Sequence, residues 1–124
     1  MSKKALILFA HGARDPEWAL PMQRVRAAVQ ARSPDQRVEL AFLEFMKPGL
    51  SDCAQRLVTE DFEHIIVVPM FIAQGGHLKQ DIPRLIDELR RKNPQACIEL
   101  SGAVGEAENV VHAMAAHVLS LAGA

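Results

Sequence analysis

Residues 65–71 of the chain read IIVVPMF, and the loop IAQGGH of residues 72–77 follows at once. An unbroken apolar run of this length is typical of a strand that is covered on both faces of a sheet. A second run, ALILFA at residues 5–10, leads directly into His11 and Gly12. The two runs predict buried parallel strands, each followed by a glycine-marked loop that carries a histidine.

Outward from these two runs, strand-like and helix-like patterns alternate along the chain. Two further strands are expected, at residues 38–45 and residues 97–100. Apolar residues at helical spacing fill the intervening segments. The expected helices are residues 21–32, a helix opened by Pro48, a helix with Asp81 as N-cap and Pro83 in its first turn that ends at Asn93-Pro94, and residues 106–121.

Four strands alternating with four helices predict an α/β fold, in which helices cover both faces of a parallel sheet. Right-handed crossovers leave few strand orders, and the order 2-1-3-4 is favoured, as in flavodoxin-like folds. A length of 124 residues fits one domain over residues 1–124, arranged as a three-layer sandwich.

Composition narrows the possible partners. The net charge is −1, and basic residues are dispersed, so nothing indicates nucleic-acid binding. The N-terminal apolar run is too short to span a membrane and no small-residue cleavage site follows it, so we expect a cytoplasmic protein without a membrane partner. Cys53 and Cys97 each sit among apolar residues, which indicates small buried core residues. They are far apart and have no CxxC partner, so a disulfide framework is not implied.

Three candidate metal ligands follow or end neighbouring strands of the predicted sheet. His11 follows the first strand, Glu44 ends the second and His77 follows the third. Strands 2, 1 and 3 would be adjacent at a spacing of about 4.8 Å, so these side chains are expected to gather at one sheet edge. Two imidazoles and a carboxylate suit Fe, Co, Ni or Zn, with coordination positions left open for a substrate. No cysteine is positioned nearby, so a closed structural zinc site is not expected.

Each of these residues also has a structural interpretation. His11 could bond to the backbone in a tight turn, His77 could be an exposed loop residue, and Glu44 could be a solvated carboxylate at a strand end. The other histidines are expected to be structural or superficial. They are His64, at the opposite end of the sheet, and His112 and His117, in the last helix.

The sequence resembles the small CbiX-type class II chelatases, which are sirohydrochlorin cobaltochelatases and ferrochelatases. The matching motifs cover nearly the whole chain in order and spacing. They are FAHGARD at residues 9–15, AFLE at residues 41–44 followed by Pro48, VPMF at residues 68–71, Gly76-His77, and Asp81-Ile82-Pro83. The Gly-His and Asp-Ile-Pro pieces are the most specific.

The resemblance implies a single CbiX-type domain that inserts Co²⁺ or Fe²⁺ into sirohydrochlorin, for cobalamin or sirohaem biosynthesis. It implies that His11 and His77 bind the metal, with Glu44 also implicated. Because imidazole titrates near neutral pH, a histidine can also accept a pyrrole proton, and our hypothesis is that one histidine, His77 being favoured, does both in sequence. The metal, Co²⁺, Fe²⁺ or Ni²⁺, is a substrate, and no organic cofactor is expected. Larger members of the family hold two such domains in one chain, which implies a homodimer here.

Sirohydrochlorin is rich in carboxylates, so cationic side chains near the implied ligands are candidates for binding it. These are Arg14, Lys47 and Lys79, although each could equally be a solvated loop cation. Glycines 12, 75 and 76 could let the flat macrocycle approach the backbone, or could serve turn geometry alone.

Two departures and two rival functions accompany the resemblance. The family commonly has serine where Ala13 stands, so a hydroxyl contact there is lost, and Pro21 is a local departure. A non-catalytic metal or tetrapyrrole carrier could use the same three ligands. A histidine phosphatase is a weaker alternative, because that family places arginine directly before the histidine, where this chain has Ala10.

Overall fold

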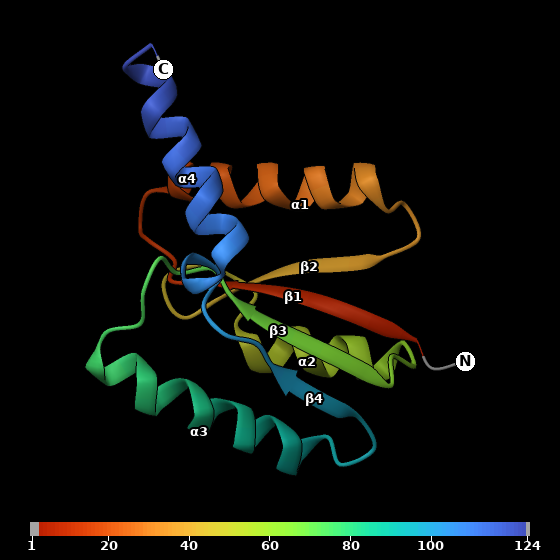
Figure 1. Ribbon diagram of the computed structural model, residues 1–124. Helices are drawn as coiled ribbons and strands as arrows, with labels where there is room; N and C mark the ends of the chain where they lie inside the picture. Colours follow the sequence, from red (N-terminus) through yellow and green to blue (C-terminus); the bar gives the residue numbers. More distant parts are fainter. Residues whose placement is uncertain (1–2, 124) are drawn as a thin grey trace.

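The computed structural model describes residues 3–123, apart from the side chain of His77, and is built on a four-stranded parallel sheet (Figure 1). The strand order is β2-β1-β3-β4, as predicted. The strands are β1 (Lys4–Ala10), β2 (Arg37–Phe42), β3 (His64–Pro69) and β4 (Cys97–Leu100). The helices are η1 (Pro16–Ala19), α1 (Leu20–Arg32), α2 (Leu50–Thr59), α3 (Gly76–Lys92), η2 (Val104–Glu106) and α4 (Glu108–Leu121), η denoting a 3₁₀ helix.

The main hydrophobic core lies between the sheet and the helices α2 and α3, on one side of the sheet (Figure 1). Alternate strand residues point into it, among them Ile7, Phe9 and Val67, and all three are fully buried. Leu57 and Ile82 meet them from the helices. Because each fully buried side chain of this size contributes about 1.5–3 kcal/mol, this layer holds the strand ends in place.

The other face of the sheet is covered less completely. Helix α1 lies on this side, over β2 (Figure 1), beside a small cluster in which Ala10, Ala19 and Phe42 are buried. Helix α4 starts beside η2 and extends away from the sheet past α1 (Figure 1). The three layers of the predicted sandwich are therefore present, but the α1 layer is partial.

The second strand is shorter than predicted, and the helix after it begins later. β2 ends at Phe42 rather than residue 45, and α2 begins at Leu50, so Glu44 and Pro48 lie in the loop between them. The backbone of Phe45 has a φ of 67°, in the left-handed region, which ends the extended conformation. The N–H of Phe42 already bonds to the carbonyl oxygen of Pro48 over 2.9 Å.

The third helix begins earlier than predicted. Gly75 is the N-cap of α3, so Asp81 is not its cap, Pro83 lies inside the helix, and His77 belongs to its first turn rather than to a loop. The apolar stripe explains the early start, because Leu78 packs against the core one turn before Ile82. Packing of this extra turn offsets the cost of an internal proline.

The two cysteines differ. Cys53 is buried in the core, and burial raises the pKa of its thiol to about 11. Cys97, at the start of β4, is exposed, which corrects the prediction that both are buried. β4 is an edge strand of the sheet, and burial on both faces is not imposed there.

The remaining histidines lie where the sequence placed them. His64 begins β3, at the sheet end opposite His11, and its Nε2 lies 3.9 Å from a carboxylate oxygen of Glu99. His112 and His117 are exposed on α4. Within residues 3–123, every helix is too short or too polar to cross a membrane.

Candidate active site

His11 occupies the carboxyl end of β1, the central position of the sheet edge. Its side chain is exposed, and its ring centroid lies 5.4 Å from that of Phe71, which follows β3 and is buried. The ring of Phe71 in turn packs against Phe9, with 6.3 Å between centroids. Two neighbouring strands therefore position an imidazole that stays open to solvent.

Glu44 lies directly beside His11 through the backbone. The N–H of Glu44 donates to the carbonyl oxygen of His11 over 3.1 Å, and the N–H of Leu43 donates to that of Ala10 over 2.9 Å. Gly12 makes this approach possible. Its φ is +89°, and a Cβ at this position would collide with the carbonyl oxygen of Glu44. These two candidate ligands are thus neighbours at the level of the backbone.

His77 reaches the same edge by way of the loop that leaves β3. It is the second residue of α3, and its side chain lies outside the described part of the molecule. The start of the loop is fixed, because the N–H of Gly105 donates to the carbonyl oxygen of Phe71 over 2.9 Å. Among the described side chains, no three His, Cys, Asp or Glu residues come together as a metal-binding group. Convergence of the three ligands stays a prediction.

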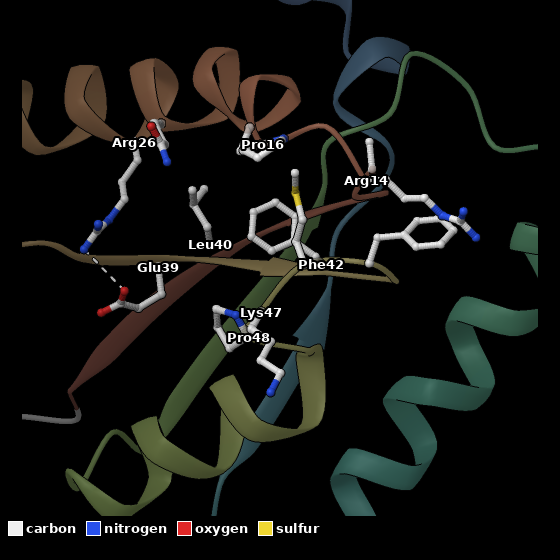
Figure 2. Close-up of a pocket in the computed structure, with 13 residues that line it drawn as sticks. Arg14, Pro16, Arg26, Glu39, Leu40, Phe42, Lys47 and Pro48 are labelled. Atoms are coloured by element: carbon white, nitrogen blue, oxygen red, sulfur yellow. Dashed lines mark hydrogen bonds and ion pairs between the residues drawn. The ribbon is translucent and has the colours of Figure 1, made fainter.

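An open pocket of about 460 Å³ adjoins the loop of Glu44, between helices η1 and α1 and the segment that links β2 to α2 (Figure 2). Arg14 and Lys47, two of the predicted substrate-binding cations, line it. Neither forms an ion pair with another described residue. In contrast, Arg26 is bound to Glu39 over 3.3 Å at the other end of the pocket. Because Arg14 and Lys47 form no ion pair within the described part of the chain, the end of the pocket that they line is suited to bind an anionic group.

Lys79, Gly75 and Gly76 lie on the other side of His11, at the start of α3. All three are exposed. A Cβ added to Gly75 or Gly76 would meet no atom within 4 Å, so close internal packing does not require glycine at either position. The backbone there is open to an approaching ligand, and the unpaired N–H groups of the first helical turn favour anions.

Sequence reasoning missed two exposed apolar residues that lie close in sequence to the candidate ligands. The side chain of Phe45, next to Glu44, is 58% exposed, and the Arg14 guanidinium lies 5.1 Å from its ring centroid. Ile72, on the loop toward His77, is 75% exposed. Their position directly after two buried strands is the signal that could have identified them. Exposed apolar side chains on the two loops that flank His11 in the sheet order suit a flat, partly apolar ligand.

Comparison with known families identifies the chain. The CbiX family model matches residues 5–121. A sirohydrochlorin cobaltochelatase of Methanococcus aeolicus is 31% identical over 83 residues, which are 67% of this chain and 58% of that protein. One from Saccharolobus islandicus strain L.S.2.15 is 38% identical over 81 residues, 65% of this chain and 62% of the relative. The matched region thus spans about three fifths of these curated relatives.

Solved structures agree with this assignment. A protein from Marinobacter aquaeolei VT8, described as a CbiX protein of cobalamin (vitamin B12) biosynthesis, superposes with a TM-score of 0.85 at 27% identity, over 97% of this chain and 98% of that one. The sirohydrochlorin chelatase SirB from Bacillus subtilis subspecies spizizenii, solved with cobalt, gives 0.79 at 25% identity, over 95% of this chain and 50% of SirB. The chain belongs to the CbiX family.

Proposed function

We propose that the protein is a chelatase that inserts a divalent metal ion, Co²⁺ or Fe²⁺, into sirohydrochlorin. The observation that carries the proposal is the exposed imidazole of His11, held beside Glu44 at the sheet edge and next to a pocket lined by unpaired cations. Relatives named sirohydrochlorin cobaltochelatase support the substrate, and SirB structures with cobalt and with Fe³⁺ support the kind of metal.

In the proposed reaction, the metal ion is a substrate held by His11, Glu44 and His77. Imidazole and carboxylate ligands without a thiolate bind such ions while allowing their release. As the ion enters the macrocycle, two pyrrole N–H bonds break and their protons pass to the protein and then to water. No electrons are transferred, and no organic cofactor takes part. Neutral imidazole accepts protons near neutral pH, and we assign this step to His77 after it has released the metal.

The substrate is proposed to bind with its macrocycle across His11 and its carboxylate arms toward the free cations. Arg14 and Lys47 serve arms that enter the pocket, and Lys79 serves those near α3. Gly75 and Gly76 leave the backbone accessible at the same place. Charge-assisted hydrogen bonds of this kind orient an anionic ligand.

The proposal includes a cytoplasmic homodimer. SirB supports the second copy, because this chain corresponds to only 50% of that structure, and a single SirB chain contains an additional stretch of equal length. Two copies of the present chain would supply the same amount of structure.

Metal insertion by the purified protein tests the proposal directly. Sirohydrochlorin is mixed with Co²⁺, Fe²⁺ or Ni²⁺, and insertion is followed from the change in its absorption spectrum. We expect faster insertion than without protein for Co²⁺ or Fe²⁺, and a loss of about 10²-fold or more for His77→Ala. His112→Ala, on an exposed face of α4, is the matched control. Tight binding without faster insertion would instead identify a carrier.

A further inference from the structure

We infer that Gly105 of η2 is a positioning residue for the metal site, because it fixes a piece of backbone that is linked to both proposed histidine ligands. The inference rests on the function proposed above, in which His11 and His77 bind the metal ion. It adds a contribution from the segment that follows β4, which carries none of the proposed ligands. Gly105 acts through the peptide that joins Phe71 to Ile72, at the start of the loop toward His77.

The hydrogen-bond register between β3 and β4 continues past the ends of both strands as far as Gly105. Just beyond β4, the N–H of Ser101 donates to the carbonyl oxygen of Val67 over 3.0 Å. The N–H of Gly105 then donates to the carbonyl oxygen of Phe71 over 2.9 Å, where η2 lies beside the loop that leaves β3 (Figure 1). Donor and acceptor are equally far apart in sequence in the two pairs, so the second bond keeps the register of the parallel ladder. The contact of Gly105 with the loop is therefore an extension of the sheet.

Gly105 also packs directly against the residue that follows the hydrogen-bonded carbonyl. A Cβ on Gly105 would collide with the Cα, the carbonyl carbon and the carbonyl oxygen of Ile72. All three are backbone atoms, so no rotation of a side chain can relieve the overlap. Glycine is required here because two backbones approach closely. The hydrogen bond holds the carbonyl of Phe71 and the packing holds Ile72, so Gly105 fixes both ends of the peptide between them.

The segment of Gly105 is anchored more firmly than the loop that it touches. Ala103, the N-cap of η2, is 2% exposed and belongs to the main hydrophobic core. Ile72, in contrast, is 75% exposed. Displacing an exposed loop residue costs less free energy than pulling a buried anchor out of the core. A side chain at residue 105 is therefore expected to push Ile72 aside and to leave η2 in place.

The peptide that Gly105 holds is linked to both proposed ligands. The ring centroid of Phe71 lies 5.4 Å from that of His11, so the Phe71 side chain packs beside one imidazole. In the other direction, residues 72–75 lead to α3, in which His77 is the second residue. A binding site keeps its properties only while its groups are held within about 0.5 Å of the productive geometry. Displacement of Ile72 therefore alters the placement of one ligand relative to the other.

The affinity for Co²⁺ in the absence of sirohydrochlorin tests this role. Isothermal titration calorimetry compares the wild type with Gly105→Ala and with the matched control Gly102→Ala, whose new Cβ meets no atom within 4 Å. We expect the Kd of Gly105→Ala to rise about tenfold or more, because loss of a residue that orients metal ligands typically weakens metal binding by about 10–100-fold. The Kd of Gly102→Ala should equal that of the wild type. A wild-type Kd for Gly105→Ala would overturn the proposal.

A double-mutant cycle with His77→Ala separates positioning from a general loss of structure. Once the imidazole of His77 is absent, its placement no longer matters, so Gly105→Ala should weaken Co²⁺ binding less in this background than in the wild type. Equal losses in both backgrounds would show that Gly105 does not act through the ligand. If His77→Ala alone binds Co²⁺ as tightly as the wild type, the ligand assignment of the proposed function is wrong, and the role of Gly105 is wrong with it. If His77→Ala binds weakly but Gly105→Ala does not, only the positioning role is wrong.

Hydrogen exchange in the unaltered protein gives a measurement that does not depend on the folding of a variant. Because coupling between two events is reciprocal, Co²⁺ must strengthen the bond from Gly105 to Phe71 if that bond strengthens Co²⁺ binding. By mass spectrometry, we expect saturating Co²⁺ to slow exchange of the Gly105 amide about fivefold or more. The amide of Cys97, which bonds to Glu63 at the opposite end of the sheet, is the control and should be unaffected. An unchanged exchange rate at Gly105 would overturn the proposal.

Discussion

The backbone N–H of Glu44 donates a hydrogen bond to the carbonyl oxygen of His11 over 3.1 Å. This bond joins the loop after β1 to the loop after β2, beyond the last pairs of the sheet. The backbone bond alone brings Glu44, which carries a carboxylate, next to the exposed imidazole of His11. Gly12 is the residue that permits it, because only glycine fits between His11 and the Glu44 carbonyl oxygen.

Gly12→Ala is therefore expected to disrupt both the fold and the site. The new Cβ meets the Glu44 carbonyl oxygen, and the φ of +89° is unfavourable for alanine. We expect a loss of about 1–3 kcal/mol in the free energy of unfolding, measured by denaturant titration, and reduced insertion activity. Gly102→Ala is the control, because a Cβ there meets no atom within 4 Å. Equal stabilities of the two variants would contradict this account of Gly12.

Substitution of Phe45 can distinguish the conformational strain of its backbone from a contact between its ring and the substrate. Phe45→Gly removes a non-glycine residue from the left-handed region, which relieves about 1–2 kcal/mol and offsets the entropic cost of glycine, roughly 0.5–1 kcal/mol. We expect little change in stability but a higher KM for sirohydrochlorin, because an exposed apolar surface beside Glu44 is lost. Phe45→Tyr keeps the ring and should keep the wild-type KM. An unchanged KM for Phe45→Gly would mean that the ring does not contact the substrate.

Cys53 should be unreactive while the protein is folded. Burial raises the pKa of its thiol to about 11, so almost none of the reactive thiolate is present near pH 8. In the Cys97→Ser variant, a colourimetric thiol reagent is expected to label no group in the native state and one group per chain after unfolding in guanidinium. Rapid labelling of the native variant would show that the α2 side of the core opens readily.

Glu60 should make stability depend on acidity. Its hydrogen bonds with Arg37, at 2.8 and 3.1 Å, lower the pKa of the Glu60 carboxyl below its ordinary value. The contribution is present above the unfolded pKa of about 4.3 and is lost as the pH falls through the lower folded pKa. The wild type should therefore exceed Glu60→Gln in Tm at neutral pH, and the gap should close in acid.

The control for this comparison is Glu63→Gln, since Glu63 forms no ion pair with another described residue. Its Tm should follow the wild type across the same range of pH. The Glu60 effect is expected to be small and to weaken with added salt, because the pair is near the surface. A gap for Glu60→Gln that widens in acid would contradict the assigned direction of the pKa shift.

The sheet order could be predicted from the sequence because alternating strands and helices indicate a parallel sheet, and right-handed crossovers leave few strand orders. The ends of individual strands and helices could not be predicted in the same way. The left-handed φ of Phe45 depends on the bond between Glu44 and His11, which no sequence pattern reveals. The early start of α3 depends on tertiary packing of Leu78. For α4, periodicity showed an apolar stripe but not which surface covers it.

The most direct test of the account is the initial rate of Co²⁺ insertion into sirohydrochlorin by the wild type, His11→Ala and the control His112→Ala at saturating metal. Because His11 is proposed to bind the metal at the reacting centre, His11→Ala is expected to lower the rate about 10²-fold or more, with wild-type secondary structure retained. His112→Ala should match the wild type. A His11→Ala variant that inserts the metal at the wild-type rate would contradict the role of this sheet edge as the active site.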